Sequence, residues 1–278
     1  VNLGTWSAIV LWGLVFLAPR YLRRVKGLGA MIAGTSLWCL ASSVSFLSLL
    51  FSQSRAAWLA ALAVIPIGLA MWLLWNRKSE RKPVRQLALA IAIVSIVLVS
   101  LLIVGSLDVV RERIHQNFDT IVQILSGDTE NLPIDSVGVR LRMYQDFWNS
   151  WQEKPLLGWG PGTAEMLLDR SGINDLGMGH FIHYHNSYFT VLLDLGAIGF
   201  SAITVMFFLI FRAAWQRRRP PFCTEETAYF LSGAFIIFGI CALTGEPLLS
   251  SSGGYFISLA GGIAYSWYLT GEIEEKRK

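Results

Sequence analysis

Three arginines of this sequence have the type and placement that suit the binding of an anion. Arg55 lies in the stretch Ser52-Gln-Ser-Arg-Ala-Ala-Trp58, immediately before a long apolar block. Arg140 and Arg142 fall in the first turn of a predicted amphipathic helix, where a cation opposes the helix dipole unless an anion neutralises it. Guanidinium groups bind phosphate oxygens bidentately. Simpler roles remain open, with Arg55 as an interfacial anchor and Arg142 as surface charge balance.

His185 is the candidate general base, within His180-Phe-Ile-His183-Tyr-His185-Asn-Ser-Tyr188. If Asn186 or Ser187 caps the helix that follows, its positive end favours a neutral imidazole, the form that accepts a proton. A purely capping or interfacial histidine is the alternative. The three histidines suggest zinc, but no cysteine or carboxylate stands close in sequence and the spacing matches no common metal pattern. We therefore expect no metal and no other cofactor.

Two carboxylates complete the set of candidates. Glu246, in Thr244-Gly-Glu-Pro-Leu248, follows an apolar block and is expected to help bind substrate, by pairing with an arginine or by positioning an acceptor. Asp194 lies inside an apolar block, where a carboxylate is costly and is usually paired. It marks either a structural bond or the site, and the sequence does not choose between the two.

The elements that position these residues are long apolar blocks. Of 278 residues, 54% are hydrophobic and 15% are charged, whereas soluble domains are about one quarter charged. At about 1.5 Å per residue, each block crosses or nearly crosses a hydrocarbon core of about 30 Å. The sequence predicts an all-α, polytopic membrane protein with seven spans, at 3–19, 28–51, 56–75, 87–107, 188–211, 228–245 and 254–270.

The basic residues predict the orientation. The connections after the first, third and fifth blocks, together with the C-terminus, hold most of the 23 Lys and Arg residues. By the positive-inside rule this side is cytoplasmic. The turn around Arg55, the stretch 108–184 and the turn 245–253 then lie on the outer side. The stretch 108–184 holds eleven acidic and six basic residues, so it is not a nucleic-acid-binding surface.

This pattern predicts three parts: transmembrane helices over 1–107, a periplasmic loop domain over 108–184, and transmembrane helices with a cytoplasmic tail over 185–278. Apolar residues at helical spacing predict helices at 110–125 and 140–153 in the loop. The second of these has an aromatic face, which either packs on the spanning helices or lies on the membrane surface; its residues are Tyr144, Phe147, Trp148 and Trp151. The glycines of 158–162 predict turns, and 170–183 a mobile lid.

Three motifs in series, over roughly residues 42–212, resemble the O-antigen ligase and polymerase superfamily. They are Ser-Arg55-Ala-Ala-Trp, then Arg140-Leu-Arg-Met-Tyr with Pro155-Leu-Leu-Gly-Trp-Gly-Pro-Gly162, and His185-Asn-Ser-Tyr with Leu192-Leu-Asp-Leu-Gly196. The resemblance implies catalytic roles for Arg55, Arg140 and His185. The family usually has Trp four residues after its second arginine, where this chain has Tyr144. Since the family has about twelve spans, we expect further spans before Val1.

The resemblance also implies an inverting, metal-independent glycosyltransferase of the bacterial inner membrane, with its site on the periplasmic side. The expected donor is a glycan on undecaprenyl diphosphate, and the expected acceptor is a lipid A–core sugar, as for an O-antigen ligase of lipopolysaccharide biosynthesis. Membrane lipids surround the chain, and nucleic acid is not a partner. A polymerase or a protein O-oligosaccharyltransferase remains an alternative. A transporter would place its site near the bilayer midplane, whereas these candidates gather at one face, which favours an enzyme.

Overall fold

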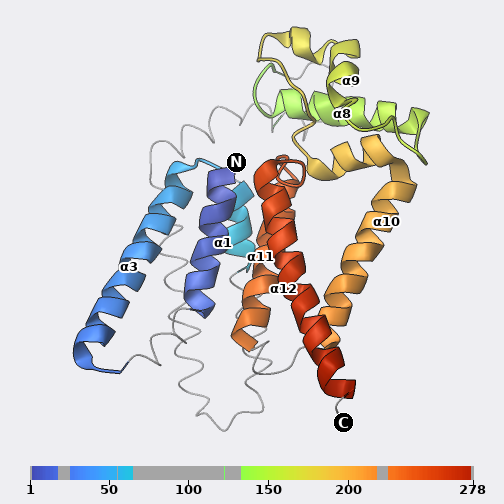
Figure 1. Ribbon diagram of the computed structural model, residues 1–278. Coiled ribbons are helices and arrows are strands. Elements are labelled where there is room, and N and C mark those ends of the chain that lie inside the picture. The colour runs from blue at the N-terminus through green and yellow to red at the C-terminus, as the bar shows by residue number, and fades with distance from the viewer. Residues whose placement is uncertain are drawn as a thin grey trace. The chain divides into compact units, whose positions relative to one another are not determined.

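The computed structural model describes residues 2–17, 26–54, 56–64, 122, 133–217 and 225–276. Within these residues all regular structure is helical (Figure 1), and the all-α membrane fold is confirmed. The chain forms two compact units. Unit 1 comprises Val1–Met71, Asn186–Tyr188 and Phe200–Lys278, and unit 2 comprises Trp72–His185 and Phe189–Gly199.

Two helices of the described chain are long and apolar enough to cross a membrane, Leu28–Phe51 and Ser187–Leu209. They coincide with the predicted spans 28–51 and 188–211. The predicted spans 3–19 and 228–245 correspond to shorter apolar helices, Leu3–Leu14 and Thr227–Ala242. The span 254–270 falls within a longer helix, 56–75 is described only to residue 64, and 87–107 lies outside the described residues. The number of spans therefore stays a prediction.

Unit 1 is a packed set of helices: α1 (Asn2–Phe16), α3 (Leu28–Phe51), α11 (Glu225–Ala242), α12 (Ser251–Lys276), the helical segment 56–64 and the later part of α10 (Ser187–Arg217). Small side chains lie in the contacts, and Ala57, Ala60 and Ala234 are fully buried. Such residues let helix backbones approach closely. Trp12 on α1 donates its indole N–H to the carbonyl oxygen of Tyr229 on α11 at 3.0 Å.

Unit 2 contains α8 (Gly138–Glu153), α9 (Ala164–Arg170) and the short 3₁₀ helix η1 (Ile173–Leu176). The helix predicted at 140–153 is confirmed. It begins two residues earlier, at Gly138. In the turn before it, Oδ1 of Asp135 accepts the N–H groups of Val137 at 3.0 Å and Gly138 at 2.7 Å. Of the helix predicted at 110–125, only Val122 is described.

The buried face of α8 differs in part from the predicted aromatic face. Met143 is fully buried and Phe147 is 5% exposed, in a cluster that also contains Leu167, Tyr184 and Leu193. Phe147 stacks on Phe189 with ring centroids 3.9 Å apart. Of the two alternatives for the aromatic face, Phe147 therefore follows the first: it packs against other side chains and does not lie on a membrane surface. Trp148, in contrast, is 54% exposed, because the helical repeat places Val139, Met143 and Phe147 at the centre of the buried stripe.

α10 is interrupted at Gly196, whose φ of 63° lies in the left-handed region. The N–H groups of Ala197 and Ile198, which the break frees from the helix, donate to the carbonyl oxygens of Pro155 at 2.8 Å and Leu156 at 3.2 Å. In return, the N–H of Trp159 donates to the carbonyl of Leu193 at 2.6 Å. The segment after α8 thus satisfies backbone groups that a broken helix leaves open.

Glycine is required where these two segments meet. A Cβ on Gly196 would lie 2.2 Å from the carbonyl oxygen of Leu156, and one on Gly158 would lie 2.5 Å from that of Leu193. Gly158, Gly160 and Gly162 all have positive φ, at 73°, 99° and 82°. The prediction of turn geometry for 158–162 is confirmed.

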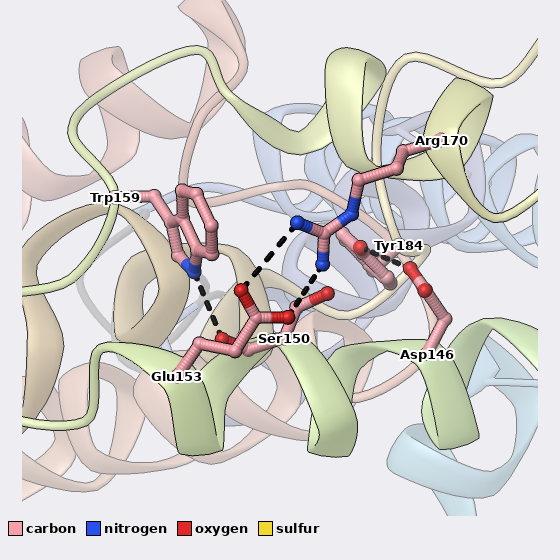
Figure 2. A network of polar contacts seen from close by, with 6 residues as sticks. All are labelled: Asp146, Ser150, Glu153, Trp159, Arg170 and Tyr184. Carbon is pink, nitrogen blue, oxygen red and sulfur yellow. Dashed lines mark hydrogen bonds and ion pairs between the residues drawn. The ribbon is translucent and has the colours of Figure 1, made fainter.

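Side-chain contacts join the end of α8 to α9 (Figure 2). Glu153 accepts a hydrogen bond from Arg170 at 2.6 Å, and the indole N–H of Trp159 donates to the carbonyl of Ser150 at 2.8 Å. The ammonium nitrogen of Lys154 lies 4.0 Å from the Trp159 ring centroid. These contacts connect α8, the glycine-rich turn and α9 into one body.

The segment 170–183, predicted to be a lid, is attached to α9 by polar contacts. His180 Nε2 lies 2.6 Å from Glu165 Oε1. The side chain of Asn174 bridges Asp169 and the backbone of Phe181. The segment contains η1 and is held at several points, so a movement of it would break these contacts.

Candidate active site

His185 stands immediately before α10 with φ of 53°, in the left-handed region that non-glycine residues rarely occupy. Its ring is half-buried among other rings. The centroid of His183 lies 4.6 Å away and that of Phe181 lies 5.7 Å away, both edge-on. A residue held in a sparsely populated backbone region needs a surrounding structure that fixes it, and the residues on either side of His185 provide one.

The preceding residue, Tyr184, is fully buried in the core of unit 2. Its hydroxyl donates a hydrogen bond to Oδ2 of Asp146 on α8 at 2.5 Å, as Figure 2 shows. Desolvation by burial raises the pKa of Asp146, and the bonds from Tyr184 and Ser171 act against that shift. Burial of the ring and a hydrogen bond at its tip thus fix the chain directly before His185.

The residues after His185 are held by the turn 244–248 of unit 1. The N–H of Asn186 donates to Oε1 of Glu246 at 3.0 Å, and the N–H and hydroxyl of Ser187 both donate to the carbonyl of Gly245 at 3.0 Å. Oδ1 of Asn186 accepts the N–H of Tyr188 at 3.0 Å. The predicted cap at the start of this helix is confirmed, and Asn186 supplies it.

The electrostatics of the site keep His185 neutral. Burial, with smaller contributions from the nearby His183 and the positive charge of Arg140, lowers the pKa of His185 to about 4. Burial likewise lowers the pKa of His183. The predicted neutral imidazole is confirmed. The sequence argument named the helix dipole as its cause, whereas desolvation is the largest contribution in the structure.

The two predicted arginines of α8 have different surroundings. Arg140 lies in the first turn and acts electrostatically on His185, so the structure brings these two predicted residues together in unit 2. Arg142 lies in the second turn and lines a pocket with Gln145, Asp146 and Asn149. The four pocket residues follow one another at helical spacing along one stripe of α8.

The other two predicted site residues are Arg55 and Glu246. Arg55 lies outside the described residues. Glu246 belongs to unit 1, where it accepts the backbone N–H of Asn186. The sequence argument gave Glu246 a role in binding substrate. The structure adds a backbone contact to the residue after His185, a positioning contact that the sequence argument did not predict.

Asp146 and Tyr184 were missed as contributors to the site. No role was predicted from the sequence for Asp146, and Tyr184 was named only as part of the His-rich stretch. Their hydrogen bond joins residues 38 positions apart, and no local pattern predicts such a pair. Among the described residues, no group of three or more His, Cys, Asp or Glu side chains is arranged to hold a metal ion.

No curated protein matches this chain. A protein-family model described as O-antigen ligase matches residues 40–204. The match includes α8, the glycine-rich turn, the His-rich stretch and the break in α10, and agrees with the resemblance deduced from roughly residues 42–212. It covers more than half of the 278 residues. The chain therefore belongs to the O-antigen ligase family, whose members are membrane proteins that act as glycosyltransferase-like enzymes in O-antigen and glycan assembly.

Proposed function

We propose that this protein is an O-antigen ligase, which transfers a glycan from undecaprenyl diphosphate to a sugar hydroxyl of the lipid A–core. The family supports a glycan-assembly enzyme that uses lipid-linked substrates. The observation that carries the proposal further is the pair of His185 and Arg140. A neutral imidazole, able to take a proton, stands within the electrostatic reach of a guanidinium, able to bind a phosphate.

In the proposed reaction the acceptor hydroxyl attacks the anomeric carbon of the first donor sugar, from the face opposite the diphosphate. The new bond joins the acceptor oxygen to that carbon, and the bond from the carbon to the diphosphate oxygen breaks. His185 accepts the proton of the hydroxyl. Arg140 and Arg55 stabilise the negative charge that develops on the departing undecaprenyl diphosphate. Attack from the opposite face inverts the anomeric configuration.

The low pKa of His185 is that of the protein with no donor bound. A base is most effective when its pKa lies near the working pH. A diphosphate bound by Arg140 brings negative charge next to the imidazole and offsets the positive charge of Arg140, which adds to the effect of burial in lowering the pKa. Donor binding therefore raises the pKa of His185 above its value of about 4. In this scheme the base gains strength as the donor binds.

The topology of the proposal is a multi-pass protein of the bacterial inner membrane with its site at the periplasmic face. The support is the alternation of basic and basic-poor connections in the sequence. An outer-leaflet site suits a lipid-anchored donor, since the diphosphate of such a donor lies at the membrane surface. Scanning single cysteines near 185 and 246 with a membrane-impermeant thiol reagent in intact spheroplasts tests this. Labelling only after membrane disruption would contradict it.

The material that accumulates in a strain lacking the protein tests the choice of reaction. A ligase deficiency leaves long glycan attached to undecaprenyl diphosphate, together with unmodified lipid A–core. A deficiency of a polymerase leaves single repeats on the lipid carrier instead, and would overturn the proposal. Complementation with Arg55→Ala, Arg140→Ala and His185→Ala variants then tests the site. Wild-type levels of ligated product from all three variants would contradict the assignment of these residues to the active site.

A further inference from the structure

A polar pocket of about 270 Å³ lies between α8 and the segment 171–176, and Asp146 is one of its lining residues. Its α8 wall is the stripe that contains Gln145, Asp146 and Asn149. Its other wall includes Ile173, which is 5% exposed and belongs to the core of unit 2. The pocket is therefore built on packed elements. Its volume is just below the range of about 300–1,000 Å³ that is usual for small-molecule sites.

The lining selects a neutral hydroxylated ligand over a strongly charged one. Gln145 and Asn149 each present an amide with donors and an acceptor, and within the described residues neither amide has a hydrogen-bond partner. Asp146 adds acceptor oxygens, and its charge offsets that of Arg142, so the pocket has no net cationic field for a polyanion. Ile173 and Leu176 line the facing wall, so most of the surface open to the pocket is polar. Amide donors and acceptors match the hydroxyls of a sugar ring.

We infer that this pocket is a subsite for one sugar residue of a glycan substrate. The inference rests on the proposed function, because it requires that the protein handles glycans. The pocket communicates with His185 through the bond from Asp146 to Tyr184, the residue before His185. His185 itself does not line the pocket, so we assign the bound sugar to the body of the glycan and not to the reacting bond. Both the donor glycan and the lipid A–core oligosaccharide have this chemistry.

The test uses a double variant, Gln145→Ala with Asn149→Ala, in the purified full chain. Both side chains are exposed on α8, so their removal leaves the core intact. Gln152→Ala is the matched control, since it removes an exposed amide from the same helix that does not line the pocket. Two readouts are taken: KM and kcat with each substrate varied in turn, and saturation-transfer NMR with two probes. The probes are the glycan released from the donor and the delipidated core oligosaccharide.

We expect KM for one substrate to rise about tenfold in the double variant with kcat near the wild-type value, because lost hydrogen bonds weaken binding uniformly. The NMR signal of the corresponding oligosaccharide should be lost with it. A change in donor KM identifies a donor sugar, and a change in acceptor KM identifies a core sugar. Values for both substrates equal to those of Gln152→Ala would overturn the inference.

The two proposals can fail separately. If the wild-type protein transfers no glycan, the proposed function fails, and the subsite is then judged by NMR alone. An oligosaccharide signal that the double variant loses and Gln152→Ala retains would still support a sugar site. Equal signals in the three proteins, or no signal in the wild type, would overturn the subsite whatever the activity.

Discussion

The hydroxyl of Tyr184 donates a 2.5 Å hydrogen bond to Oδ2 of Asp146, and this bond fixes the chain one residue before His185. His185 itself has a left-handed backbone, with φ of 53°. The hydrogen bond and the full burial of the Tyr184 ring resist relaxation of that backbone. The position of the imidazole therefore depends on α8 as well as on the His-rich stretch.

Loss of this hydrogen bond should lower both stability and activity. In Tyr184→Phe, the partly buried carboxylate of Asp146 loses its closest donor, which should decrease the free energy of unfolding by about 1–3 kcal/mol. Asp146→Asn keeps an acceptor oxygen and should lose less than Asp146→Ala. Denaturant unfolding in detergent measures this. Tyr265→Phe, on an exposed ring of α12, is the control, and a loss equal to that of the control would contradict the role of the bond.

Arg140→Ala should raise the pKa of His185, because it removes a positive charge that disfavours protonation. The acidic limb of kcat/KM, near pH 4 in the wild type, should then move to higher pH. NMR titration of labelled histidines measures the pKa directly. His180 is the internal reference, since its pKa is raised by Glu165 and should not respond. An unchanged pKa of His185 would contradict the electrostatic link.

The depressed pKa of His185 should also make stability depend on pH. Between pH 6.5, the ordinary pKa of histidine, and about pH 4, the pKa of His185 in the folded protein, the unfolded chain binds a proton at this residue and the folded chain does not. The free energy of unfolding therefore falls as the pH decreases through this window, and is restored above it. His185→Asn should flatten this part of the profile. A profile with the same slope in both proteins would show that other groups cause it.

Gly196→Ala should be strongly destabilising. The new Cβ would lie 2.2 Å from the carbonyl oxygen of Leu156, and φ of 63° adds strain of about 1–2 kcal/mol for a non-glycine residue. Gly254→Ala, on α12 with no atom within 4 Å of the new Cβ, is the matched control and should be neutral or slightly stabilising. Thermal unfolding compares them. Equal midpoints would mean that the break in α10 is not held by the glycine-rich segment.

Glu246→Gln should destabilise the protein less than Glu246→Ala does. Gln retains an oxygen to accept the N–H of Asn186, which Oε1 of Glu246 accepts at 3.0 Å. Ala leaves that buried N–H without its acceptor, at a cost of about 1–3 kcal/mol. Transfer rates and unfolding midpoints of the two variants distinguish the structural role of Glu246 from a role in binding substrate. If Gln is as damaging as Ala to the rate but not to stability, the charge of Glu246 acts on substrate, as the sequence argument expected.

The structural features that could be predicted from the sequence are those that depend on residues close together in the chain. The 140–153 helix follows from apolar spacing, the cap at Asn186 from its side-chain chemistry, and the turns at 158–162 from glycine. The neutral state of His185 was also predicted, but from the helix dipole, whereas burial is the largest cause of the low pKa. Each depends on residues within a few positions of one another.

The contacts that complete the site join distant positions and were not predictable in this way. Tyr184 and Asp146 are 38 residues apart, and Asn186 and Glu246 are 60 apart. Their pairing depends on how helices dock, and helix periodicity says which face is buried but not against what. The same limit applies to the aromatic face of α8: the pattern left open whether it packs or lies on the membrane surface, and the structure buries Phe147 but leaves Trp148 54% exposed.

Glycosyl transfer by His185→Ala tests the central claim most directly. Purified wild-type, His185→Ala and His183→Ala proteins are compared in single turnover with lipid-diphosphate glycan and lipid A–core, and the ligated product is quantified. Loss of a positioned general base should slow transfer by about 10²–10⁴-fold, whereas His183→Ala, which removes only a neighbouring ring, should retain most of the rate. Transfer by His185→Ala at the wild-type rate would contradict the assignment of His185 as the base.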